Sequence, residues 1–60
     1  MLELPYRTIE DLPPAVRKLP TAEQRQWMAV FNKVYAEQGE EAAFRIAWGV
    51  VRKRHHDDEA

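Results

Sequence analysis

The chain has 60 residues, 45% of them hydrophobic, and a formal net charge of −1 at pH 7. This length allows one domain near the lower limit for folding without cross-links, and the absence of cysteine excludes disulfides and thiolate zinc sites. The near-neutral charge excludes a general attraction to nucleic acid or membranes, and no apolar run approaches the ~20 residues of a membrane span, so we expect a cytoplasmic globular protein.

All four prolines lie within the first 20 residues and limit the structure there. Residues 1–8 alternate roughly between apolar and polar side chains, with Pro5 among them, which indicates an extended arm or a short edge strand. Asp11 and Pro13 predict a helix start, because aspartate caps amide hydrogens and proline lacks one that the first turn leaves unused. Since Pro20 disfavours helical geometry at the residue before it, we expect a short helix over residues 13–18.

The next segment predicts a long helix over residues 22–38. Thr21 and Gln24 have the spacing of a capping box, in which each side chain bonds the amide hydrogen of the other residue. Apolar side chains then recur at helical intervals along one face, and these are Trp27, Met28, Phe31, Val34 and Tyr35. Gly39 is expected to end the helix, because glycine adopts left-handed backbone angles without a steric penalty.

Asn32 is a polar residue beside this apolar face, between Met28 and Tyr35. A buried amide needs hydrogen-bond partners. We therefore expect its side chain to bond backbone groups of the turn at residues 10–14, which would pin the first segment to the long helix.

A second long helix is predicted over residues 40–54, where the charges complement the peptide dipole. Glu40 and Glu41 open it, and three cations close it at positions 52–54. Its apolar face is wide: Ala43, Ala47 and Val51 form the centre, Phe44 and Trp48 one edge, and Ile46 and Val50 the other. One neighbouring helix cannot cover such a face. Either the N-terminal segment or a second copy of the chain must complete the cover, and we favour the segment and hence a monomer over a homodimer.

These elements predict a mainly α, three-helix domain over residues 1–56, followed by an acidic tail at residues 57–60 that frays in solution. The residues expected to hold the structure together are aromatic, small or turn-forming. They are Asp11, Leu12, Pro13, Trp27, Phe31, Asn32, Ala47 and Trp48.

No catalytic constellation stands out in the chain. Serine and cysteine are absent, so the two commonest nucleophiles of covalent catalysis are missing, and two isolated glycines do not form a phosphate-binding loop. His55 and Glu59 have the spacing of helical metal ligands only if the last helix continues through an acidic end that its dipole disfavours. We therefore expect no enzymatic activity, no cofactor and no metal site.

The outer face of the last helix is the candidate binding surface. Gly49 lies in the middle of this helix, where glycine costs ~1 kcal/mol relative to alanine. A small residue edged by arginines can receive a helix or strand of another protein, so we expect docking through Arg45, Gly49, Arg52 and Lys53. The alternative is a nucleic-acid-binding accessory protein that contacts phosphates through the same basic helix, although no exposed aromatic side chain can be named beside the cations.

Two segments resemble the ChaB family, whose members are described as regulators of cation transport. The first contains Asp11-Leu12-Pro13 and Leu19-Pro20, and the second contains Phe31-Asn32 and Ala47-Trp48. The resemblance implies a small, mainly helical domain with a non-enzymatic role. It implies as partner a cation/proton antiporter or a regulator of one, while similar domains beside nucleic-acid-related domains leave the alternative open.

Overall fold

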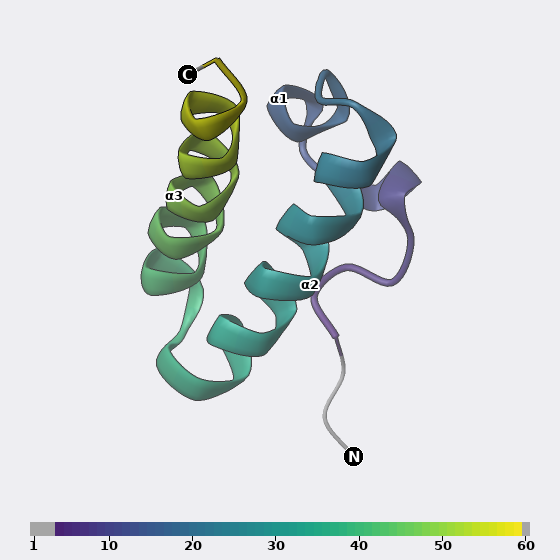
Figure 1. Ribbon diagram of the computed structural model, residues 1–60. Coiled ribbons are helices and arrows are strands. Elements are labelled where there is room, and N and C mark those ends of the chain that lie inside the picture. Colours follow the sequence, from purple (N-terminus) through teal and green to yellow (C-terminus); the bar gives the residue numbers. More distant parts are fainter. Residues whose placement is uncertain (1–3, 60) are drawn as a thin grey trace.

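The computed structural model describes the backbone of residues 4–59 and the side chains of residues 4–53. Its helical elements, in chain order, are the 3-10 helix η1 (Ile9–Asp11), α1 (Pro14–Arg17), α2 (Thr21–Gln38) and α3 (Glu40–Glu59). The two long helices run antiparallel side by side, and η1 lies on the side of α2 remote from α3 (Figure 1). The mainly α, three-helix fold predicted from the sequence is confirmed.

The three predicted helices differ from the expectation only at their ends. α1 is shorter than residues 13–18, and α2 begins one residue earlier than expected, at Thr21. α3 begins at Glu40 as predicted but extends to Glu59, five residues beyond the expected end at position 54. No glycine or proline follows Gly49, so the backbone meets no helix breaker there. The side chains of residues 54–60 lie outside those described, and fraying of the tail stays a prediction.

Gly39 connects the two long helices by itself. Its φ of +95° lies in the region that favours glycine. Its amide hydrogen bonds the carbonyl of Tyr35 at 3.0 Å, and its carbonyl accepts from the amide of Ala43 at 3.1 Å. One residue thus ends α2 and starts α3, as the sequence predicted, and the chain reverses direction within it.

The N-terminal arm, residues 4–8, has no regular secondary structure and bends at Pro5, Arg7 and Thr8, and no strand forms between residues 4 and 59. Asp11 was expected to cap the first helix, and this is wrong. It belongs to η1, which the sequence did not predict, and its carboxylate accepts a hydrogen bond from the Thr8 hydroxyl at 3.2 Å. Pro13 precedes α1 instead and makes no side-chain cap.

The capping box predicted at the start of α2 is also absent. Pro20 is the N-cap, and Thr21 is already helical. The Gln24 side chain reaches back further than a capping box allows and donates to the carbonyls of Arg17 at 3.1 Å and Leu19 at 2.6 Å. It thereby satisfies carbonyl groups at the end of α1, where helices leave acceptors unpaired.

The core lies between α2 and α3 and is closed by residues of the first segment. Trp27 and Phe31 stack with ring centroids 4.9 Å apart, and both are buried. The other buried apolar residues are Leu12, Val16, Val34, Ala43, Ala47 and Val51. Of the residues expected to be structural, Pro13 and Trp48 are half-buried and Asp11 is exposed.

The first segment covers less of α3 than expected. α1 and η1 pack against α2, which is also the main partner of α3. Leu12 and Val16 reach the core, but Leu4 is 53% exposed. The edges of the apolar face of α3 therefore stay half-buried: Phe44 and Trp48 on one edge, Ile46 and Val50 on the other.

Asn32 pins the arm to α2, at a different place from the one predicted. Its side-chain oxygen accepts from the Tyr6 amide at 3.3 Å, and its side-chain nitrogen donates to the Tyr6 carbonyl at 2.8 Å. The partner is therefore the arm and not the turn at residues 10–14. The Tyr6 ring lies against Trp27 and Phe31, with centroids 5.9 and 5.0 Å away.

Candidate docking surface

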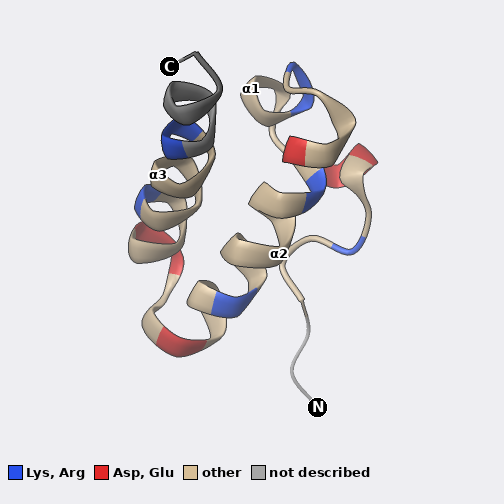
Figure 2. Cartoon of the chain, in the orientation of Figure 1, with Lys and Arg blue, Asp and Glu red and all other residues tan. Residues whose placement is uncertain are grey.

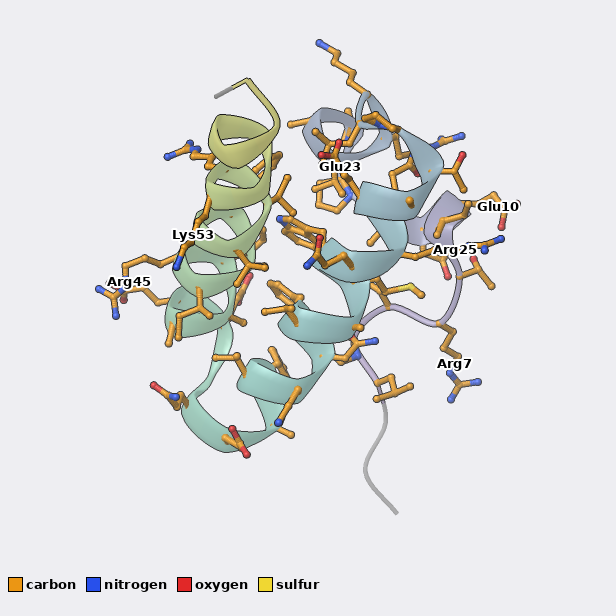
Figure 3. All side chains as sticks on the ribbon, in the orientation of Figure 1. Arg7, Glu10, Glu23, Arg25, Arg45 and Lys53 are labelled. Carbon is orange, nitrogen blue, oxygen red and sulfur yellow. The ribbon has the colours of Figure 1, made fainter. Side chains whose placement is uncertain are left out.

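Three exposed cations lie on the side of α3 that faces away from α2, and they are Arg45, Arg52 and Lys53. Lysine and arginine recur along α3 (Figure 2), and the side chains of Arg45 and Lys53 extend away from α2 (Figure 3). With the exposed Gly49 between them, they form a surface that we call the α3 outer surface. The structure thus brings together all four residues that the sequence singled out.

The face of α3 opposite the α3 outer surface is buried in the core. Ala43 and Ala47 are 0% exposed and Val51 is 1% exposed. Because one face of α3 is buried and the other is charged, packing in the core fixes the orientation of this helix. The cations therefore sit on a rigid support rather than on a loop.

Gly49 leaves open space on the α3 outer surface. A methyl group placed on it would meet no atom within 4 Å beyond its own helix and chain neighbours. Its backbone is ordinary helix without positive φ. Nothing in the packing of this chain therefore requires glycine, which makes the residue a destabilising choice for the helix alone.

Arg52 lies over the ring of Trp48, with its guanidinium carbon 6.0 Å from the ring centroid. This distance is at the outer limit for a cation–π interaction. Trp48 in turn packs edge-on against Trp27, with centroids 5.8 Å apart. Trp48 is half-buried, so part of its ring lies beside the cations, although no aromatic side chain among the described residues of α3 is exposed there, in line with the expectation from the sequence.

A separate shallow pocket of about 210 Å³ lies near the first segment, lined by Ile9, Glu10, Arg17 and Gln24. Glu10 and Arg17 are exposed, and the Gln24 amide is engaged by backbone carbonyls. Figure 3 shows Glu10 on the side of the molecule remote from α3. The pocket is therefore not part of the α3 outer surface.

Two polar side chains, one half-buried and one buried, have roles that were not predicted. Burial raises the pKa of the Tyr6 hydroxyl, and the negative charge of Glu40 raises it further. Glu23 is only 6% exposed and lies on the side of α2 toward α3 (Figure 3). Its position four residues before Trp27 is the signal that could have placed it on the buried face.

Two features are absent from the part of the chain that the structure describes. No group of three or more histidine, cysteine or acidic residues there could hold a metal ion. None of the helices, within the part of the chain that is described, is both long and apolar enough to cross a membrane.

The family model described as ChaB matches residues 12–60 of the chain, so Asp11, the first residue of the resemblance described above, lies just outside the matched segment. No curated protein and no solved structure matches.

Proposed function

Because this chain belongs to the ChaB family, we propose that it is a non-enzymatic regulatory protein that docks on another protein through the α3 outer surface. The family points to a role in regulating cation transport, and the partner would be a cation/proton antiporter or a protein that controls one. A cytoplasmic location and a monomeric state, both expected from the sequence, remain predictions.

One observation carries this proposal: a helix with a fully buried inner face presents three exposed cations around a glycine that its own packing does not require. Arginine and tryptophan are enriched among the residues that dominate protein interfaces. Arg52 already rests over Trp48, so part of the side-chain ordering that binding would cost is complete in the free chain.

Site-specific photo-crosslinking in the source cells tests the docking surface. A photoreactive amino acid replaces Lys53, which is exposed on the α3 outer surface, so Gly49 and both arginines stay unchanged. We expect it to give a discrete adduct with one protein, which mass spectrometry then identifies. The adduct should disappear when Arg45 and Arg52 are both changed to glutamate, because the attraction to the partner would become repulsion.

The matched control carries the same photoreactive group at Ala29, which is exposed on α2. Ala29 should give no such adduct. Equal adducts from both positions, or none from position 53, would rule out docking through α3. An antiporter subunit or its regulator in the adduct would support the transport role, and an unrelated partner would retain docking but reject that role.

The second candidate is a nucleic-acid-binding accessory protein, and the Arg52–Trp48 pair favours it because single-stranded nucleic acids bind cations beside aromatic rings. Gel-shift titrations with DNA and RNA at two salt concentrations test this role. Binding that weakens steeply with salt and needs Arg45 and Arg52 would support it. Absence of a shift at low salt would eliminate it.

A further inference from the structure

The edge of α3 formed by Phe44 and Trp48, which we call the aromatic edge, adjoins the α3 outer surface. Both rings are half-buried and pack edge-on against Trp27, with centroids 5.8 Å away in each case. They follow each other by one helical turn, so they form a continuous apolar strip along the helix. α2 supports this strip from beneath and leaves its outer side accessible.

Two arginines border the aromatic edge at regular spacing. Arg45 and Arg52 are seven residues apart, which places them on one line about 10 Å apart along the helix at ~1.5 Å per residue. Trp48 lies between them in sequence and beneath Arg52. The pattern is an apolar strip flanked by cations at heptad spacing, which is how helices in coiled coils recognise a partner helix.

The charges on this side of α3 favour an acidic partner of limited charge. Arg45 and Arg52 are exposed on its border, and the exposed Glu41 is the described acid on the same line, one turn before Arg45. Two cations and one carboxylate attract a few matched carboxylates well. They suit a polyanion poorly, because affinity for nucleic acid grows with the number of neutralised phosphates.

From these features we infer that the docking partner presents an acidic amphipathic α-helix, which lies along α3. An apolar side chain of that helix packs on the aromatic edge, and two of its carboxylates, seven residues apart, pair with Arg45 and Arg52. This inference rests on the proposed function, since it names the chemistry that the same surface recognises. The open space at Gly49 allows the partner helix to approach closely on the other side of the arginine line.

Fluorescence anisotropy with labelled peptide helices of about 20 residues tests the inference. The first peptide carries two glutamates seven residues apart around a leucine, the second has glutamines in their place, and the third has lysines. We expect the full chain to bind the glutamate peptide about tenfold more tightly than the glutamine peptide. The double variant R45E/R52E should reverse the order and prefer the lysine peptide.

Arg25→Glu combined with Lys33→Glu is the matched control, because it changes the net charge equally at exposed positions of α2. This variant should keep the preference for the glutamate peptide. If R45E/R52E does not fold by circular dichroism, R45Q/R52Q replaces it and should abolish the preference without reversing it. Equal binding of the glutamate and glutamine peptides, or an equal effect of the control variant, would overturn the inference.

Failure of the inference is distinguishable from failure of the proposed function. If position 53 still gives its cross-link while no peptide is preferred, docking stands and the acidic helix is wrong. If the cross-link is also absent, both are wrong. A single-stranded oligonucleotide that binds more tightly than the glutamate peptide, through the same two arginines, would overturn the acidic helix in favour of nucleic acid.

Discussion

Asn32 holds the N-terminal arm to α2 through two hydrogen bonds, since its side chain accepts from and donates to the backbone of Tyr6. Asn32→Ala removes both bonds and leaves the Tyr6 backbone groups to find water. We expect the free energy of unfolding to fall by ~1–3 kcal/mol, the usual cost when buried polar groups lose their partners. Urea denaturation followed by circular dichroism measures the change.

Lys33→Ala is the control for this substitution, because Lys33 is the next residue and is exposed. Its effect should stay within about 0.5 kcal/mol, as for most surface positions. A loss at Asn32 no larger than the loss at Lys33 would show that the arm is not held by this side chain in solution.

Tyr6 makes the stability of the chain depend on alkaline pH. Burial and the charge of Glu40 raise its pKa above the ordinary value of 10.0, so the folded state holds the hydroxyl proton more tightly than the unfolded state does. Ionisation of Tyr6 therefore leaves the free energy of unfolding unchanged well below pH 10. Between pH 10 and the higher folded pKa it lowers this free energy, because the unfolded state releases its proton first. Tyr6→Phe should lose less stability over this window, as urea midpoints at successive pH values will show. Parallel losses in both proteins would contradict the effect.

At the scale of the helices, replacing the two glycines by alanine should change the free energy of unfolding in opposite directions. Gly39 joins α2 to α3 at a φ of +95°, which an alanine adopts only with strain. Gly49 has helical geometry and open space around it. Gly39→Ala should therefore lower the free energy of unfolding by ~1–3 kcal/mol, because its φ of 95° and ψ of 179° lie in a region used almost only by glycine, whereas Gly49→Ala should raise it by up to ~1 kcal/mol.

Thermal unfolding of both glycine variants measures this difference, and each serves as the control for the other. Gly49→Ala should also weaken the cross-link or peptide binding at the α3 outer surface, because the methyl group occupies the space left for a partner. A variant that is more stable and binds unchanged would show that Gly49 is merely tolerated there.

The long helices could be predicted from sequence because their signals are local. The apolar spacing of α2, Gly39 and the paired glutamates of α3 each act within a few residues. The role of Gln24 could not be predicted, because the carbonyls that it binds come from the end of another helix, and their position depends on the turn around Pro20. The same limit applies to Asn32, whose partner lies 26 residues away.

At the scale of the whole molecule, the exposure of the α3 outer surface followed from the helical spacing of its residues. The accessibility of Trp48 did not, since a helical wheel gives the direction of a side chain but not how much of it a neighbour covers. The sequence led us to expect cover from the first segment, yet that segment packs on α2. The sequence placed Phe44 and Trp48 on one edge of α3, but the incomplete cover of this aromatic edge depends on where the first segment packs.

At the scale of the whole molecule, replacing each tryptophan by alanine shows how much its ring contributes to the free energy of unfolding. Trp27 is 0% exposed and contacts the rings of Tyr6, Phe31, Phe44 and Trp48. A core aromatic replaced by alanine costs ~3–5 kcal/mol. A chain of this size has roughly 3–9 kcal/mol in total, so Trp27→Ala should leave a large part of the population unfolded, as circular dichroism will report.

The stability of the Trp48→Ala variant distinguishes a monomeric chain from one whose aromatic edge is covered by another molecule. A half-buried ring with one aromatic neighbour loses less on truncation than a core ring does, so we expect ~1–2 kcal/mol for Trp48. The fluorescence of the remaining Trp27 follows unfolding in this variant. A loss as large as that of Trp27→Ala would mean that Trp48 is covered in solution. The melting temperature of the unmodified chain would then rise with protein concentration if a second copy supplies the cover, because association stabilises the folded state by mass action.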